Sequence, residues 1–384
     1  MFNELDVGRK RNIANILKAV HSIIPPTYVD TSTISNFEIR SGFHSGVKIN
    51  RLIVYLRSSG CRWMLDDEFG GCTICGHIAG STFGKKISDI EYINQFDEII
   101  SKFNFAEIPM VCVYNEGSLF NEDEMPSIAR EHIFRRLNEI SGINHVIFEA
   151  RPEHLSQENL RVMRRLIPNK GIEIGIGLES SNEYVRQICL NKGFHARDFL
   201  KAVELLRIYG VNSLAYVSLK PPFLSERFAI DDSVRTIKWA FNHGINVVSL
   251  EPVSVQKFTL IHLLYKMNIY RPPWIWSVFT VVSQVGQLGL VRIGGGEFYP
   301  SPFIYTHNCP LCNEAGVNTI ESYNSSNDMG VITSFFKDSC SNCKDEWSNQ
   351  LNDESCIEDL IDTFISSFRN IDLSTLLGDE SFML

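Results

Sequence analysis

The sequence predicts an α/β fold, a partial (β/α)6 TIM-type barrel with a small cysteine-rich C-terminal region. From about residue 46, short runs of branched apolar residues alternate with amphipathic helical patterns. Such alternation is typical of a parallel sheet with right-handed crossovers. Six of these units precede residue 300, fewer than the eight of a closed barrel. From Ser301 the composition shifts to Ser, Asn, Asp and Cys, which sets the C-terminal region apart.

Residues 1–45 are expected to form an amphipathic helix and a lead-in to the barrel. Ile13, Leu17 and Val20 recur at helical spacing with polar residues between them, which is the pattern of a helix with one apolar face. This pattern differs from the continuous apolar core of a signal peptide.

The barrel is assigned to residues 46–300. Its expected strands are apolar runs followed directly by polar or glycine-containing residues. They are the segments 52–56, 109–114, 145–149, 172–178, 213–219 and 246–251. Because ligands bind at the C-terminal ends of parallel strands, we expect the residues after these runs to meet at one mouth.

The composition is that of a soluble globular protein. Of 384 residues, 44% are apolar and 21% charged, and no apolar run approaches the roughly 20 residues of a membrane-spanning helix. The expected location is therefore the cytoplasm, with no membrane partner. The net charge is −9, and residues 301–384 contain 14 acids against 3 bases. The remainder is close to neutral, so charge alone predicts no basic patch for nucleic acid.

Three cysteines lie in the loop directly after the first expected strand. Cys61, Cys72 and Cys75 are flanked by glycines, which suit a backbone that wraps a cluster. Three thiolates can hold three irons of a [4Fe–4S] cube, which four cysteines usually hold. The missing ligand would leave one iron free to bind and activate another molecule. The alternative is a partial zinc site with His77 as the fourth ligand.

Two Cys-x-x-Cys pairs lie in the acidic C-terminal region, 301–384. Cys309, Cys312, Cys340 and Cys343 have the pattern of a structural zinc ribbon, although the spacer between the pairs is long. A second iron–sulfur cluster or unmetallated thiols are the alternatives.

The loop after the second strand contains Asn115, Glu116, Gly117 and Ser118. It offers a carboxylate, a glycine and a hydroxyl next to the cysteine loop. The carboxylate and the strand-end backbone could accept hydrogen bonds from an ammonium group.

Further charged residues follow the later strands. Glu179 could bind the hydroxyls of a ribose, or could cap the following helix together with Ser180. Glu149 and Arg151 could form an ion pair at the mouth or bind a ligand. Three glycines from Gly294 to Gly296 could let the backbone approach a ligand closely, or could form a flexible turn.

Taken together, these residues resemble the radical SAM superfamily. More narrowly, residues 41–347 resemble the archaeosine-forming radical SAM enzymes (RaSEA), which are related to the radical SAM domain of the Elongator catalytic subunit. The matching segments are Gly60-Cys-Arg-Trp63, Gly70-Gly-Cys-Thr-Ile-Cys-Gly76, Tyr114-Asn-Glu-Gly-Ser-Leu-Phe120, Glu149-Ala-Arg-Pro-Glu153, Gly175-Ile-Gly-Leu-Glu-Ser180, Asn191-Lys-Gly-Phe194, Leu219-Lys-Pro-Pro-Phe-Leu224, Val255-Gln256, Tyr270-Arg-Pro-Pro-Trp-Ile-Trp276 and His307-Asn-Cys309.

The resemblance implies a cofactor set and a reaction. Cys61, Cys72 and Cys75 would hold the [4Fe–4S] cluster, whose open iron binds S-adenosylmethionine. A one-electron reductant would then drive its cleavage to a 5′-deoxyadenosyl radical, which abstracts hydrogen from the substrate. The 115–118 loop would bind the methionyl amino group, and Glu179 the ribose. Glu149 is a further candidate for cofactor binding.

The resemblance also implies a substrate. RaSEA is a lyase that breaks a carbon–nitrogen bond in a lysine adduct on a deazaguanine base of tRNA, leaving a formamidine. The candidate residues for weaker substrate contacts are Arg151, Lys220, Gln256, Gly294, Gly295 and Gly296. The alternatives are a radical SAM enzyme acting on a free small molecule or amino-acid derivative, and a non-enzymatic zinc protein that recruits a partner.

Overall fold

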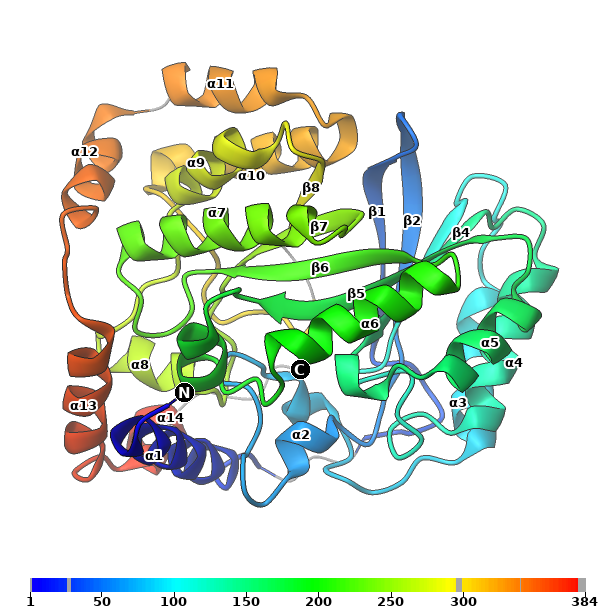
Figure 1. Ribbon diagram of the computed structural model, residues 1–384, viewed down its shortest axis with the longest axis horizontal. Coiled ribbons are helices and arrows are strands. Elements are labelled where there is room, and N and C mark those ends of the chain that lie inside the picture. Colours follow the sequence, from blue (N-terminus) through cyan, green and yellow to red (C-terminus); the bar gives the residue numbers. More distant parts are fainter. Residues whose placement is uncertain (1, 26–28, 295–298, 339, 379–384) are drawn as a thin grey trace.

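The computed structural model describes residues 2–25, 29–294, 299–338 and 340–378. Its centre is an eight-stranded sheet whose strands lie side by side in the order of the sequence. The strands are β1 (Asn36–His44), β2 (Val47–Tyr55), β3 (Met110–Tyr114), β4 (His145–Ala150), β5 (Gly171–Glu179), β6 (Asn212–Leu219), β7 (Val247–Pro252) and β8 (Leu290–Ile293). The sheet is curled into a partial barrel (Figure 1), and the predicted fold class is confirmed.

The strands β2 to β8 are all parallel, and β1 alone pairs antiparallel with β2. The six predicted strands correspond to β2–β7, whereas β1 and β8 were not predicted. The extra strand β1 arises because Ser45 and Gly46 both adopt positive φ, at 50° and 84°. This is the backbone of a tight two-residue hairpin turn, which the sequence analysis had included in the lead-in to the barrel.

Helices cover the outer face of the sheet and continue beyond it. They are α1 (Glu4–His21), α2 (Arg62–Leu65), α3 (Asp89–Ile100), α4 (Ser127–Glu139), α5 (Gln157–Leu166), α6 (Ala196–Ile208), α7 (Glu226–Asn242), α8 (Leu260–Lys266), α9 (Ile275–Val285), α10 (Pro310–Ser326), α11 (Met329–Asp338), α12 (Ser341–Gln350), α13 (Ile357–Phe368) and α14 (Leu373–Leu377). Helices α6 and α7 pack on β5, β6 and β7, and the main apolar core lies between this helical layer and the sheet. None of the helices in the described ranges is both long and apolar enough to cross a membrane.

A second, smaller apolar cluster fills the inside of the curled sheet. Its members come from alternate positions of successive strands, among them Ile53, Cys112, Ile147, Leu214 and Val247. We call this interior the lumen. Because side chains alternate along a strand, the residues two positions further along each strand also face the lumen and lie nearer its mouth.

Helix α10 spans the two edges of the sheet, since it contacts both β1 and β8. Asn324 on α10 binds the backbone of Ile293 in β8 through its side-chain oxygen and nitrogen, at 2.8 and 2.7 Å. These bonds occupy backbone groups that an edge strand would otherwise leave unpaired.

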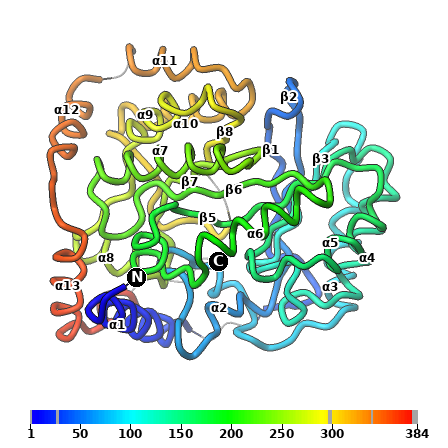
Figure 2. The backbone as a smooth tube through the Cα atoms, in the orientation of Figure 1, coloured from blue at the N-terminus to red at the C-terminus, as the bar shows by residue number. Residues whose placement is uncertain are grey.

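The two terminal segments also lie together. Figure 2 shows α1 beside α13, where Arg9 donates two hydrogen bonds to Asp362, at 2.9 and 2.6 Å.

Candidate active site at the barrel mouth

The cysteine loop lies at the C-terminal end of β2. Cys61 precedes the short helix α2, and Cys61, Cys72 and Cys75 are all half-buried. Burial raises the pKa of Cys61 and Cys75 to about 12, and the neighbouring Cys72 contributes to both shifts. The three thiols are therefore close neighbours within one partly closed site.

The sulfur atoms of this loop are not gathered around one point. Among the described residues, only the four C-terminal cysteines form a group whose ligand atoms could hold a single ion. Thiolates that bind three different irons of a cube must stand further apart than ligands that share one ion. The three cysteines therefore fit a [4Fe–4S] cluster better than a zinc ion.

Asn191, in the loop after β5, braces the cysteine loop. Its side-chain nitrogen donates to the carbonyl oxygens of Phe69 and Gly71, both at 2.7 Å, and its own carbonyl accepts from the Trp63 indole at 2.7 Å. Gly71 has φ +89°, and a Cβ there would lie 2.9 Å from the Cα of Met64. The loop can close this tightly only because a glycine stands at that position.

Gln256 braces the same loop from the other side. The backbone nitrogen of Gly76 donates to its side-chain oxygen at 2.6 Å. A Cβ on Gly76 would lie 2.8 Å from that oxygen. Gln256, a candidate for substrate contact, is thus engaged with the cysteine loop, 180 residues away along the chain.

The loop after β3 contacts the cysteine loop directly, because a Cβ on Gly117 would lie 3.4 Å from the Cα of Cys61. Asn115 in this loop is fully buried, and neither its side-chain oxygen nor its nitrogen has a hydrogen-bond partner in the described part of the chain. Buried polar groups are normally paired. Asn115 therefore fits a site that a polar ligand completes.

Glu116 is held by hydroxyl groups. Ser35 and Ser58 donate to its two carboxylate oxygens at 3.1 and 3.4 Å. Burial raises its pKa to about 7, so near neutral pH the group is poised between its two protonation states.

Glu124 joins the two loops and was not singled out from the sequence. Its buried carboxylate accepts hydrogen bonds from the backbone nitrogens of Arg62 and Ser118, at 2.8 and 2.5 Å, and from the Asn121 side chain at 2.8 Å. A Cβ on Gly117 would collide with this carboxylate. Glu124 stands in a polar run typical of a surface loop, which gave no signal that it would be buried.

Glu179 ends β5 with a left-handed backbone, φ 61°. Its two oxygens accept from Lys192 at 2.7 Å and from Ser218 at 2.6 Å. Burial lowers the pKa of Lys192, but Glu179 and Cys72 outweigh it and raise that pKa above its usual range. Lys192 thus lies as a cation between Glu179 and the cysteine loop. No pattern in the sequence indicated a role for this lysine.

Arg151 lies against the aromatic wall of the cysteine loop. Its guanidinium lies 5.2 Å from the ring centroid of Trp63 and 5.7 Å from that of Phe194, and it donates to the Lys192 carbonyl at 2.9 Å. Its ion pair is with Glu153, at 2.5 Å. The alternative of an ion pair between Glu149 and Arg151 is therefore not observed.

The other candidates for substrate contact lie in different surroundings. Lys220 forms a buried ion pair with Glu226 at 2.6 Å, and its Nζ lies 5.7 Å from the Tyr270 ring centroid. Glu226 therefore neutralises the charge of Lys220, on the side that faces α9. Gly294 lies against the carboxylate of Glu251. Gly295 and Gly296 lie outside the described residues.

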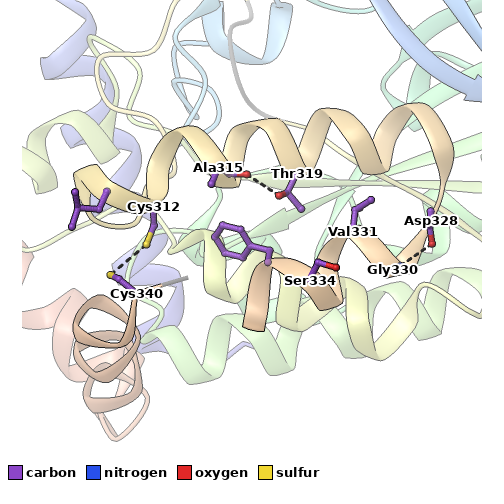
Figure 3. A pocket seen from close by; sticks show the side chains of 10 residues that line it. Cys312, Ala315, Thr319, Asp328, Gly330, Val331, Ser334 and Cys340 are labelled. Atoms are coloured by element: carbon purple, nitrogen blue, oxygen red, sulfur yellow. Dashed lines mark hydrogen bonds between the residues drawn. The ribbon is translucent and has the colours of Figure 1, made fainter. Parts of the chain in front are cut away.

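The second cysteine set lies away from the mouth, at the N-termini of helices. Cys309 precedes α10 and Cys340 precedes α12. The secondary structure here is helical, whereas a zinc ribbon was expected. A pocket of about 840 Å³ lies between α10 and α11. Figure 3 shows Cys312 and Cys340 at one end of it. The Trp276 indole donates to the Cys343 sulfur at 3.4 Å.

The spacing of these four sulfurs suits one ion. The Sγ atom of Cys340 lies 3.4 Å from the Sγ atoms of Cys309, Cys312 and Cys343. The Sγ atoms of Cys312 and Cys343 are 3.7 Å apart. Four thiolates in a tetrahedron with zinc–sulfur bonds of about 2.3 Å would be separated by roughly 3.8 Å. The arrangement is thus close to a tetrahedral site.

The chain was compared with known proteins. No protein-family model matches it. It is 31% identical over 313 residues to archaeosine synthase subunit beta of Methanosarcina acetivorans, covering 80% of this chain and 86% of that protein. It is 30% identical over 233 residues to archaeosine synthase subunit beta of Thermococcus kodakarensis, covering 60% of this chain and 70% of the relative. Among solved structures, methylornithine synthase aligns with a TM-score of 0.45 at 10% identity, over 76% of this chain and 72% of that one.

Proposed function

The chain belongs to the archaeosine synthase subunit beta family of radical SAM enzymes, and we propose that it cleaves a carbon–nitrogen bond of a modified base in tRNA. In this proposal the base carries an amino-acid adduct, and the reaction begins with abstraction of a hydrogen atom from that adduct.

Cys61, Cys72 and Cys75 would hold a [4Fe–4S] cluster. When bound, the cluster and S-adenosylmethionine supply the 5′-deoxyadenosyl radical that abstracts hydrogen. The remaining residues bind and orient the cofactor and the substrate, and they exclude water from the site. Arg151 and Trp63 shield one side of the cysteine loop, and the cation of Lys192 reduces the negative charge that three thiolates bring together.

Asn115 and Glu179 would position S-adenosylmethionine. The unpartnered amide of Asn115 offers both an acceptor and a donor to the methionyl end. Each carboxylate oxygen of Glu179 accepts one hydrogen bond. Each oxygen therefore keeps a lone pair that can accept a further hydrogen bond from a ribose hydroxyl. The observation that supports this proposal best is the buried, unpartnered Asn115 in the loop that contacts Cys61.

The test is anaerobic turnover by the reconstituted protein. With S-adenosylmethionine, dithionite as the one-electron reductant and tRNA that carries the lysine adduct, we expect 5′-deoxyadenosine and a formamidine-bearing nucleoside, both measured by mass spectrometry. If 5′-deoxyadenosine forms and the tRNA stays unchanged, the substrate assignment fails and a free small molecule becomes the better candidate.

We also propose that Cys309, Cys312, Cys340 and Cys343 hold a structural zinc ion. Their near-tetrahedral separations and the seating of Cys343 against Trp276 support this assignment. Metal analysis of the purified chain should then find one zinc in addition to the iron of the cluster.

A further inference from the structure

The lumen contains two carboxylates that the proposed chemistry leaves unused. Glu149 stands near the end of β4 and Glu251 near the end of β7. Burial raises the pKa of both, and the charge of Glu251 adds to the shift of Glu149. The nearby Glu179 raises both further. The two groups therefore lie close enough to repel each other.

Neither carboxylate forms an ion pair with a basic side chain within the described ranges. Other carboxylates inside the barrel do: Glu173 binds Arg292 at 2.6 Å, and Glu179 binds Lys192. Glu251 accepts a hydrogen bond from the neutral Ser249 hydroxyl at 2.6 Å.

The nearest cations form no ion pair with either carboxylate. Lys192 lies within electrostatic range of Glu149 but forms its ion pair with Glu179. Arg40 and Arg51 lie within electrostatic range of Glu251. Arg40 forms its ion pair with Glu38 at 2.5 Å, and Arg51 forms none with the carboxylates that the structure describes. Burying a carboxylate pair without a counter-charge is costly, so this arrangement fits a site whose cation arrives with a ligand.

The walls around Glu149 are aromatic. Tyr55, Tyr114 and Tyr216 all lie within electrostatic range of its carboxylate, and the rings of Tyr55 and Tyr114 are 5.7 Å apart. The buried hydroxyl of Tyr216 lies within hydrogen-bonding reach of the Glu149 carboxylate and of Tyr114. Tyrosine faces attract cations, and a phenolic oxygen can accept a hydrogen bond from one.

Two glycines leave the space that these side chains occupy. A Cβ on Gly294 would collide with the Glu251 carboxylate, and a Cβ on Gly175 would lie 2.6 Å from the Tyr216 ring. The carboxylate and the ring therefore pack directly against glycine backbone.

The chemistry favours an ammonium group over a metal ion. Oxygen-bound metals take six or more ligands, several of them from protein. The described residues contain no carboxylate group of three or more that converges on one point. We infer that Glu149 and Glu251 together bind a protonated amine of the substrate inside the tyrosine-lined lumen. This inference rests on the proposed function and names the chemical group by which that site recognises its substrate.

The test measures binding, so that it does not depend on turnover. The probes are n-pentylamine and its neutral isostere 1-pentanol, observed by saturation-transfer NMR on reconstituted full-length protein with S-adenosylmethionine. We expect the amine to bind at least about tenfold more tightly than the alcohol, because removing one partner from a buried charge pair costs more than that factor. Glu149→Gln and Glu251→Gln should each abolish this preference while iron content stays unchanged and the melting temperature does not fall below that of the wild type.

Glu204→Gln is the matched control, because Glu204 is a carboxylate on the exposed face of α6, paired with Arg207. It should keep the preference of the wild type. Equal binding of the two probes by the wild type, or a preference that survives in the glutamine variants, would overturn the inference. Loss of amine binding on addition of Mg²⁺ that itself binds through the same carboxylates would overturn it in favour of a metal site. A failed tRNA assay with the preference intact would leave the amine site standing and reject only the tRNA substrate.

Discussion

The two sets of cysteines in this chain are arranged in different ways. At the mouth, Cys61, Cys72 and Cys75 lie on a long loop that distant residues hold in shape. In the C-terminal region, the four cysteines begin two helices and gather within 4.8 Å of one another. The comparison teaches that ligand spacing follows from the supporting structure: helix N-termini give a compact tetrahedral set, whereas a braced loop keeps three thiols apart around a larger volume.

The largest expected effect comes from a substitution that removes the metal of one cysteine set and leaves the other set unaffected. Cys72→Ala should abolish cluster assembly and all 5′-deoxyadenosine formation, because two thiolates remain for three irons. The C-terminal site should keep its zinc, since it shares no ligand with the mouth. Iron and zinc analysis with an anaerobic assay checks both statements, and loss of both metals would contradict the separation.

Cys312→Ser should have the reverse outcome. Zinc should be lost and unfolding should become easier by roughly 3 kcal/mol or more, because loss of a structural metal is among the most damaging single changes. Iron should remain at the mouth. Zinc content and thermal unfolding measure the effect, and an unchanged melting temperature with zinc absent would show that the metal has no structural role.

Asn191→Ala tests whether the mouth depends on its brace. The change removes two side-chain hydrogen bonds and leaves alanine at φ 50°, so we expect a loss of about 2–3 kcal/mol and a lower iron content after reconstitution. Asn327→Ala is the control, because Asn327 also has a left-handed backbone, φ 55°, at the end of α10 but lies far from the mouth in the chain and on another element. Equal iron loss in both variants would mean that the brace is not specific.

The smallest effect concerns a buried carboxylate at the barrel mouth. Burial raises the pKa of Glu149 from 4.5 to about 7, so the folded state keeps a proton that the unfolded state has lost between these values. The stability that this proton contributes is complete below pH 4.5 and is lost as the pH rises through 7.

Glu149→Gln removes this dependence. Relative to the wild type, the variant should gain about 1–3 kcal/mol of stability between pH 4.5 and 8. Urea unfolding at the two pH values measures the difference. Glu116 has a similar pKa but is present in both proteins, so its contribution cancels. If the difference in unfolding free energy between variant and wild type is the same at both pH values, Glu149 does not lie in a site that disfavours its charge.

Much of the architecture could be predicted from the sequence because it depends on local pattern. The six apolar runs correspond to β2–β7, since alternation of strand and helix patterns is sufficient to indicate a parallel sheet. The hairpin strand β1 was not predicted, because its residues alternate between the lumen and exposed positions such as Phe37 and Ile39. An apolar side chain that faces solvent gives a misleading pattern.

The candidate site was predictable only in part. The cysteines and the strand-end residues share short sequence motifs, which a reader of the chain can recognise. Glu124, Asn191 and Gln256 act through hydrogen bonds to loops up to 180 residues away, and no local pattern marks such a role. For Lys220, a strand-end position predicted a ligand contact, yet the buried Glu226 takes its charge.

The sequence by itself determined the order of strands and helices, the two cysteine sets and the family to which the chain belongs. These properties follow from periodicity and from motifs that stand in one stretch of chain. Only the tertiary structure decided which carboxylates have counter-charges, as in Glu179 with Lys192, and which have none, as in Glu149 and Glu251. The reason is physical: burial and Coulomb interactions depend on distance in space, and the curling of the sheet, not the order of residues, sets that distance.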